Sequence, residues 1–263
     1  MTENQDGPRR RCHSVAVLAD IHGNLPALEA VLAEPDVAAA DAVVLLGDIA
    51  LGPLPGQTLD RLAELGDRGV WVHGNCEREL VAAFDGAEVP GPNGAAAAAT
   101  AALISAAHRD LLTGLPLTVT LDVAGLGAVL FCHASPRRDD EMVLVDSPAQ
   151  RWADVLAGVT APTVVCGHTH MQFDRLAAGH RVLNPGSVGM AYGQPGAPWA
   201  LLGQQVSLRS TAYDAEAAAA RIGAGGYQDA ASWAREYVLN RYTADEALAA
   251  FTEIARQQQA GEG

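Results

Sequence analysis

Seven side chains that can bind metal ions recur along the chain, each just after a short apolar run. They are Asp20, His22, Asp48, Asn75, His133, His168 and His170. Short apolar runs of this kind predict buried strands, and ligands in such sheets lie beyond the ends of the strands. We therefore expect the loops after these strands to bring the seven side chains together in one site.

The ligand atoms indicate which ions such a site would hold. Carboxylate and amide oxygens are combined with imidazole nitrogens, a set that suits Mn, Fe or Zn better than Ca or Mg, which prefer oxygen alone. Seven side chains exceed the four ligands of one tetrahedral zinc, whereas a pair of ions about 4 Å apart needs about this number. We expect two divalent metal ions, Mn or Fe in the first place and Zn as the alternative.

Each motif is weak when it is taken singly. An Asp followed two residues later by His, as at Asp20 and His22, is more often a turn than a metal site. The Gly-His-Thr-His segment that contains His168 and His170 is more specific, because two histidines one residue apart at a strand end have few structural uses. The prediction of a metal centre therefore depends on the ordered set.

The elements that must position these residues follow from apolar runs and helix signals. Strands are predicted at 15–19, 43–46, 70–72, 117–121, 128–132, 163–166, 173–176, 181–183, 199–202 and 206–211. Helices are predicted at 25–34, 57–65, 95–112, 148–156, 215–222, 230–239 and 244–257. The first half alternates strand and helix, which favours a sheet with helices packed on it.

Composition and charge exclude several classes of protein. The chain has 263 residues, of which 49% are hydrophobic and 18% charged, as in ordinary folded proteins. With 17 basic and 31 acidic residues the net charge is -14. A body this acidic repels phosphate backbones and anionic lipids, so we expect no membrane binding and no non-specific nucleic-acid binding.

We expect a single domain at 14–257 that includes the C-terminal helices, flanked by a flexible tail at 1–13 and a second tail at 258–263. The first apolar run ends at Asp20, too early for a signal peptide, and no run approaches the roughly 20 residues of a membrane span. The four cysteines form no Cys-x-x-Cys pair. We expect a cytoplasmic protein with reduced thiols. The sequence leaves open whether the chain forms a homo-oligomer.

The ordered motifs resemble those of the calcineurin-like metallophosphoesterase superfamily. The series reads Asp20-x-His22, Gly47-Asp48, Gly74-Asn75, His133 and Gly167-His168-x-His170, and the resemblance covers residues 15–214. The chain is most similar to the small bacterial phosphodiesterase branch, which shows a sequence like Asn184-Pro185-Gly186-Ser187 and often has Gly-Asn-Cys in place of Gly-Asn-His. The resemblance implies an α/β (α+β) fold, a four-layer αββα sandwich of two mixed β-sheets.

The resemblance also implies a role for each motif residue. The first metal ion would be held by Asp20, His22 and His170. The second would be held by Asn75, His133 and His168. Asp48 would bridge the two ions, and a hydroxide shared between them would attack phosphorus, so that the chain acts as a binuclear metal-dependent phosphoesterase on phosphodiester bonds. Catalytic roles are thus expected for Asp48, Asn75 and Cys76, and substrate contacts for Asn75, His73 and His168.

Two positions depart from the pattern of most members. Cys76 replaces a histidine, and a thiol with a pKa near 8.5 is a poorer proton donor, so monoesters with poor leaving groups should suffer most. Alternatively, Cys76 is only a small, partly buried residue at a helix start. His73 stands where many relatives have an arginine that contacts phosphate, so substrate binding would depend more on the metals or on Arg78, Arg137 or Arg138.

Other functions stay open for the same metal site. The substrate is expected to be a small phosphoester or nucleotide-like molecule, but a nucleotide pyrophosphohydrolase or a phosphoprotein phosphatase would use the same ligands. The run Ile49-Ala50-Leu51-Gly52 lacks the Val-Asp-Arg-Gly of protein Ser/Thr phosphatases. A non-catalytic scaffold of this fold would usually lose ligands, whereas all seven positions are filled.

Overall fold

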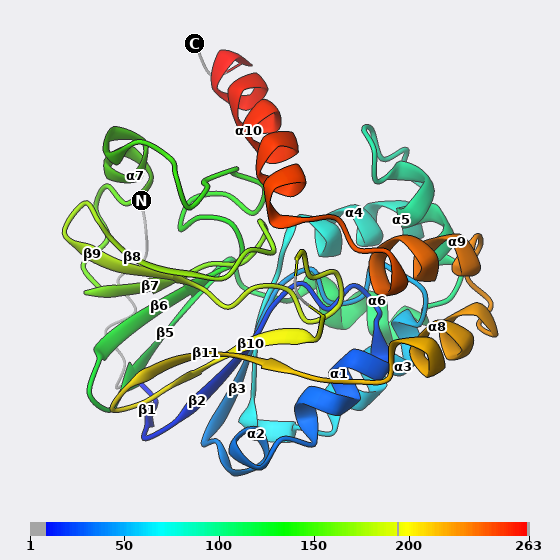
Figure 1. The fold of residues 1–263 in the computed structure, drawn as a ribbon, viewed down its shortest axis with the longest axis horizontal. Coiled ribbons are helices and arrows are strands. Elements are labelled where there is room, and N and C mark those ends of the chain that lie inside the picture. Colours follow the sequence, from blue (N-terminus) through cyan, green and yellow to red (C-terminus); the bar gives the residue numbers. More distant parts are fainter. Residues whose placement is uncertain (1–8, 194, 262–263) are drawn as a thin grey trace.

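Two β-sheets pack face to face, with helices on their outer sides (Figure 1). The computed structural model describes residues 9–193 and 195–261. The six-stranded sheet has the order β1 (Arg11–Cys12), β5 (Thr118–Val123), β6 (Gly127–Cys132), β7 (Thr163–Val165), β9 (His180–Asn184), β8 (Phe173–Ala177). The five-stranded sheet has the order β11 (Val206–Thr211), β10 (Ala197–Leu202), β2 (Val15–Leu18), β3 (Ala42–Leu46), β4 (Gly69–Val72).

Both sheets are mixed. Strands β2, β3 and β4 are parallel to one another, as are β6, β7 and β9, while β5–β6, β8–β9 and β10–β11 pair antiparallel. The helices are α1 (Leu25–Leu32), α2 (Pro35–Ala39), α3 (Pro55–Ala63), α4 (Asn75–Phe84), α5 (Gly94–Ala101), α6 (Ala106–Thr113), α7 (Ala149–Val155), α8 (Ala215–Gly223), α9 (Ala230–Ala234) and α10 (Ala244–Gly261). The predicted sandwich of two mixed sheets between helices is confirmed.

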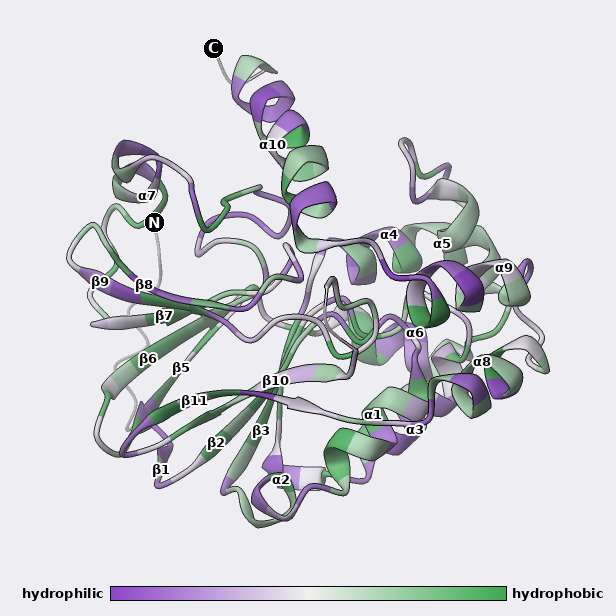
Figure 2. Cartoon of the chain, in the orientation of Figure 1, coloured by the Kyte–Doolittle hydropathy of each residue, from purple (hydrophilic) through white to green (hydrophobic). Residues whose placement is uncertain are grey.

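Strands β2 and β3, inside the five-stranded sheet, are buried on both faces. In β2, Val15 and Val17 pack between the two sheets against residues such as Phe131, whereas Ala16 and Leu18 pack against the outer helices. Figure 2 shows these strands as hydrophobic along their length. A strand covered on both sides reads as a continuous apolar run, which is why β2 and β3 were predictable from the sequence.

One predicted helix is broken in the structure. The prediction of a single helix at 95–112 is wrong, because α5 ends at Ala101 and α6 begins at Ala106. The Ser105 hydroxyl accepts a hydrogen bond from the His108 N–H and so caps a new helix start. Alanine propensity favours helix through the whole stretch and does not reveal such a break.

The tails predicted at 1–13 and 258–263 contain regular structure in their described parts. Residues 262–263 lie outside the described residues. Residues 1–8 lie outside the described residues, but Arg11 and Cys12 form β1, paired with Asp122 and Val123 of β5. The side chain of Cys12 is buried between the sheets. At the other end, α10 continues past 257 to Gly261. Helix α4 was not among the predicted elements, and residues 235–239 form a π-helical turn rather than regular α-helix.

Candidate metal centre

The loops after β2, β3, β4, β6 and β7 meet at the edge where the two sheets come together (Figure 1). Three strands belong to the five-stranded sheet and two to the six-stranded sheet. All the predicted ligands lie in these loops, and their side chains are buried or nearly so. Residues up to 150 positions apart in the sequence thus form one cluster, as the strand-end pattern predicted.

Two groups of ligand atoms lie next to each other in this cluster. In the first, His22 Nε2 is 3.2 Å from His170 Nε2, which is 3.3 Å from Asp20 Oδ1. In the second, His133 Nε2 is 3.2 Å from His168 Nδ1. Within each group the atoms are close enough to share one ion.

Asp48 lies between the two groups. Its Oδ1 is 3.3 Å from His133 Nε2, and its Oδ2 is 3.9 Å from His22 Nε2. One carboxylate oxygen therefore faces each group. This is the arrangement that a bridging ligand for two ions requires.

Backbone carbonyls fix the orientation of three imidazoles. The Nδ1–H groups of His22, His133 and His170 donate to the carbonyls of Leu51, Leu46 and Met190, at 3.2, 2.8 and 3.0 Å. The three Nε2 atoms therefore face the cluster. Each ring is held in the orientation in which Nε2, once free of a proton, can bind a metal ion.

The backbone is strained at most of the predicted ligands. Seven non-glycine residues of the described chain have a positive φ, and five of them are Asp20, His22, Asp48, His168 and His170, with φ between 48° and 65°. Each such residue costs on the order of 1–3 kcal/mol and persists only where the surrounding structure enforces it. Strain concentrated at these positions points to a function that requires them.

Three glycines allow the loops to approach the ligands. A Cβ atom at Gly47 would lie 2.6 Å from His133 Nδ1, one at Gly74 2.3 Å from Asp48 Oδ1, and one at Gly167 2.8 Å from Asp20 Oδ2. No side chain fits at such distances. The glycines that precede Asp48, Asn75 and His168 in the motifs are therefore steric requirements of the site.

Glu77 organises two of the ligand loops, and sequence reasoning gave it no role. Its buried carboxylate accepts the N–H groups of Asp48, Ile49 and Gly74 at 2.7, 2.8 and 2.8 Å. Burial and the nearby Asp48 charge raise the pKa of Glu77 to about 7. An acid three residues after the N-cap of a helix, here Gly74, is a capping signal that could have identified it.

The Asn-Pro-Gly-Ser segment after β9 joins the first and last ligand loops. Asn184 Nδ2 donates to the Gly167 carbonyl at 2.8 Å and to the Thr169 hydroxyl at 3.1 Å. The Ser187 hydroxyl donates to the Asp20 carbonyl at 2.7 Å. This segment thus positions ligand loops instead of contributing ligands. Tyr192, which sequence reasoning also missed, stacks on the His170 ring with centroids 5.5 Å apart.

Cys76 is buried at the start of α4, beside the cluster. Its N–H donates to Asp48 Oδ1 at 3.0 Å, and its thiol lies near His22 and Asp48. Burial, followed by the Asp48 charge, raises the pKa of the thiol well above its usual value. The side chain is 3% exposed and packs with Leu51 and Ala97. The thiol is therefore un-ionised at neutral pH.

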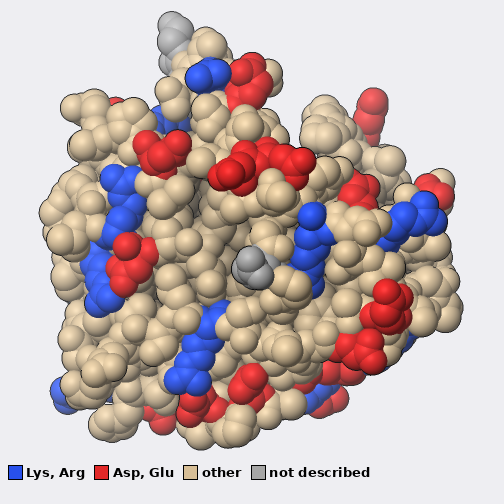
Figure 3. Space-filling view, in the orientation of Figure 1, with Lys and Arg blue, Asp and Glu red and all other residues tan. Residues whose placement is uncertain are grey.

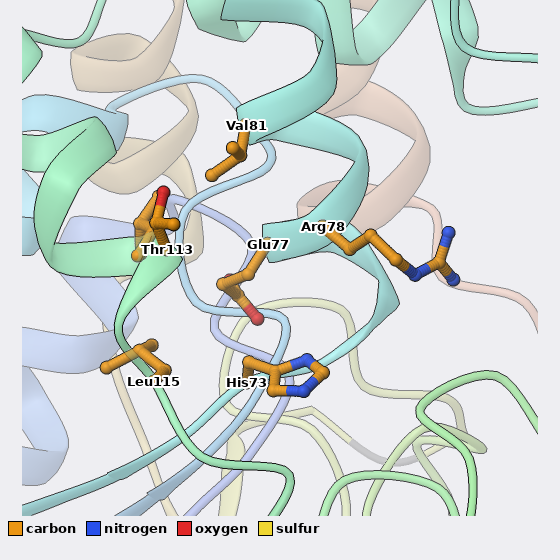
Figure 4. Close-up of a pocket in the computed structure, with 7 residues that line it drawn as sticks. His73, Glu77, Arg78, Val81, Thr113 and Leu115 are labelled. Atoms are coloured by element: carbon orange, nitrogen blue, oxygen red, sulfur yellow. The ribbon is translucent and has the colours of Figure 1, made fainter.

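His73 lies beside the ligand cluster but outside it. It borders a cavity of about 230 Å³ together with Glu77, Arg78 and Thr113 (Figure 4). Its Nδ1 is 3.5 Å from Asp139 Oδ2, and Arg78, which extends away from the cavity in Figure 4, also binds Asp139. Arg137 pairs with Glu141 and Arg138 with Asp140. These arginines are thus engaged with acidic groups.

Charges within the cluster shift its pKa values in opposite directions. Burial alone would lower the pKa of His133, but the Asp48 carboxylate raises it to about 10. Burial and the charge of His133 lower the pKa of His168 to about 4. The imidazoles in turn hold the pKa of Asp48 well below its usual range, although burial opposes this. The aspartate is ionised, so the cluster attracts cations.

The donor set fits a pair of divalent ions. Asn75 Oδ1 is buried and has no hydrogen-bond partner among the described residues, which costs about 1–3 kcal/mol unless a ligand satisfies it. Asn75 directly precedes Cys76, whose thiol lies near His22 and Asp48, and an amide oxygen combined with imidazole and carboxylate ligands suits Mn, Fe or Zn.

Comparison with known proteins gives one family match and several structural relatives. The model of the calcineurin-like phosphoesterase superfamily domain matches residues 14–204. A hypothetical protein from Pyrococcus horikoshii OT3 is 23% identical, with a TM-score of 0.70, over 80% of this chain and 92% of that one. A metallophosphoesterase from Sphaerobacter thermophilus is 25% identical, with a TM-score of 0.63, over the same shares.

A putative diadenosine tetraphosphatase shares the fold more distantly, at 19% identity and a TM-score of 0.54, over 78% of this chain and 99% of that one. No curated protein matches the chain at a significant level. Within residues 9–193 and 195–261, none of the helices combines the length and apolar character needed to cross a bilayer.

Proposed function

This chain belongs to the calcineurin-like phosphoesterase superfamily, and on that premise we propose that it is a binuclear metal-dependent phosphodiesterase. The observation that carries the proposal is the position of Asp48, which directs one carboxylate oxygen to each of two groups of buried imidazoles. The orphaned Asn75 Oδ1 supports it, because a ligand at this point would satisfy a buried polar atom.

In the proposed site, Asp20, His22 and His170 would hold one ion, Asn75, His133 and His168 would hold the other, and Asp48 would be shared between them. Two divalent ions would supply positive charge for a phosphate and lower the pKa of water from about 15.7 toward 7. The residues of the chain orient this centre: backbone carbonyls fix the imidazoles, and Glu77 holds the loop of Asp48 against the start of α4.

The environment of Cys76 supports a diester substrate. A monoester with a poor leaving group needs a proton donor at the leaving oxygen. The Cys76 thiol is a weak donor with a raised pKa, and it is almost fully buried. The leaving group of an activated diester departs without a proton donor. Substrate contacts from Asn75, His168 and His73 also belong to the proposal, and His73 lies outside the two ligand groups.

The test is metal-dependent hydrolysis of an activated diester. Chelator-treated protein should take up two ions of Mn, Fe(II) or Zn per chain and hydrolyse bis(p-nitrophenyl) phosphate only after metal is restored. Asp48→Asn should lower kcat/KM at least about a hundredfold, because losing a shared ligand removes several kcal/mol of charge stabilisation. Asp85→Asn is the matched control, since Asp85 forms only a surface ion pair with Arg109.

No stoichiometric metal uptake, or full turnover by Asp48→Asn, would show the proposal to be wrong. A panel of simple diesters, dinucleoside polyphosphates and phosphopeptides separates the proposed activity from that of a pyrophosphohydrolase or a phosphoprotein phosphatase. Metal uptake without hydrolysis of any panel member would indicate a non-catalytic scaffold.

A further inference from the structure

A cavity of about 490 Å³ lies beside the candidate metal centre, along the first turns of α10. It is of the size that small organic ligands occupy in proteins. One of its walls is His170, whose imidazole also belongs to the first ligand group. A molecule with its phosphate at the metal centre therefore has this cavity within reach of its remaining part.

The walls of the cavity are mainly apolar and partly aromatic. The apolar lining residues are Val145, Met171, Tyr192, Pro198 and Leu248. The Tyr192 and His170 rings are stacked, at an interplanar angle of 20°, and Phe251 of α10 packs edge-on against both, at 6.5 Å from His170 and 5.8 Å from Tyr192. Polar groups are provided by Gln172 and Ser210. Such walls suit a flat ring system that carries a few hydrogen-bonding groups.

The charge of the cavity disfavours a second phosphate. Apart from the His170 imidazole, none of its described lining residues is basic, and Asp245 contributes a carboxylate. Figure 3 shows acidic side chains near the base of α10, where Asp245 and Glu246 form the first turn. An uncharged group is therefore preferred here over the phosphates of a dinucleoside polyphosphate.

The walls are fixed to one another, so the cavity exists before a ligand binds. The Gly193 N–H donates to the Tyr242 carbonyl at 2.9 Å, and Arg241 donates to the Gly196 carbonyl at 2.7 Å. Farther along α10, Gln258 accepts the Met142 N–H at 2.8 Å. These bonds join α10 and the segment just before it to the loops beside the candidate metal centre. The family match ends at residue 204, so this wall is a feature that the family model does not describe.

We propose that this cavity binds the organic group that a diester substrate retains, and that this group is an uncharged, flat ring system such as a nucleobase on its sugar. The inference rests on the proposed diesterase function, because it places the phosphate at the metal centre. Stacking on Tyr192 and contact with Leu248 would favour nucleoside diesters over simple alkyl diesters with the same leaving group.

The first test compares two substrates with a common leaving group, methyl p-nitrophenyl phosphate and the p-nitrophenyl ester of thymidylate. The wild-type chain should prefer the thymidylate ester in kcat/KM, and Leu248→Trp should lower that preference about tenfold through KM. Ile254→Trp, on the exposed side of the same helix, should leave the preference as it is. Tyr192→Ala should also lower it about tenfold, since stacking is lost, and Tyr192→Phe should preserve it.

A wild-type chain without preference for the nucleoside ester, or a Leu248→Trp or Tyr192→Ala chain that keeps it, would overturn the inference. A second test does not depend on activity. Metal-free protein should transfer saturation to the base protons of thymidine in nuclear magnetic resonance experiments, Leu248→Trp should lose this transfer, and Ile254→Trp should keep it. If neither diester is hydrolysed, the proposed function is wrong. If the wild-type chain transfers no saturation to thymidine, the proposal that the cavity binds a nucleoside is wrong.

Discussion

His133 is the residue at which a metal ion competes most directly with a proton. The Asp48 carboxylate, 3.3 Å away, raises the pKa of His133 to about 10 despite burial, so the imidazole is protonated at neutral pH in the metal-free protein. A metal ligand must be neutral, whereas His168, with a pKa lowered to about 4, is already neutral. If the proposed centre binds metal at pH 7, it would therefore displace a proton from His133.

We expect release of about one proton per chain at pH 7 when Mn binds, and weaker binding and lower activity as the pH falls. Calorimetric titration in two buffers of different ionisation enthalpy measures the release. His133→Gln, which keeps a polar side chain but cannot hold the proton, is the comparison and should release less. Metal uptake by the wild-type chain without proton release would contradict this assignment.

We expect the side chain at Cys76 to influence which class of ester the proposed site hydrolyses. In Cys76→His, an imidazole with a pKa near neutrality replaces a buried thiol and can protonate the leaving oxygen, so we expect hydrolysis of phenyl phosphate, a monoester with a poor leaving group, to rise relative to that of the activated diester by about tenfold. The kcat/KM ratio for the two substrates is the measurement. Cys76→Ser, which preserves size, is the control. An unchanged ratio in Cys76→His would favour a purely structural role for Cys76 at the start of α4.

At the scale of elements, the turn between β4 and α4 leaves no room for a side chain. In Gly74→Ala the new Cβ would lie 2.3 Å from Asp48 Oδ1 and 2.8 Å from the Asp48 nitrogen. We expect metal affinity to fall at least about tenfold, as happens when groups that orient ligands are disturbed. Gly74 has a φ of -106°, which alanine adopts without strain, so any loss of affinity comes from the added Cβ.

The matched control is Gly223→Ala at the end of α8, where an added Cβ meets no atom within 4 Å. Because Gly223 is helical, we expect this change to stabilise the protein by about 0.5–1 kcal/mol and to leave metal affinity unaltered. Titration with Mn and denaturant unfolding measure the two effects. Equal metal affinity in Gly74→Ala and wild-type protein would show that a Cβ at this position does not disturb Asp48.

The elements that the sequence predicted best are those with simple local signals. The buried strands β2 and β3 are unbroken apolar runs, and α1 begins where Asn24 accepts the Ala27 N–H at 3.2 Å. The break between α5 and α6 and the start of α4 depend on single capping contacts that alanine propensity and apolar periodicity do not reveal.

The same contrast holds within the site. The candidate ligands were identified because their residue types are chemically distinctive. The carbonyls that orient the imidazoles belong to Leu46, Leu51 and Met190, whose side chains give no hint of that role. Tyr192 and the α10 wall reach His170 only through the tertiary fold.

At the scale of the whole molecule, metal binding should stabilise the fold. Ions that bind only the native state add free energy of unfolding, about 2.7 kcal/mol for a site at a hundredfold excess over Kd. For a chain of this size that corresponds to a rise of several degrees in Tm. Thermal unfolding with and without Mn measures it, and Asp48→Asn should respond less. A wild-type Tm that does not change with Mn would contradict the prediction that metal binding stabilises the fold.

The candidate ligands come from both sheets: Asp20, His22, Asp48 and Asn75 follow strands of the five-stranded sheet, and the remaining three follow β6 and β7. The main contact between the sheets is an apolar layer, which is non-directional. Bound ions would therefore act as a removable cross-link between two layers. Removing them would let the layers slide at this edge, so amide hydrogens at the carboxyl ends of β3 and β6 would exchange together and faster.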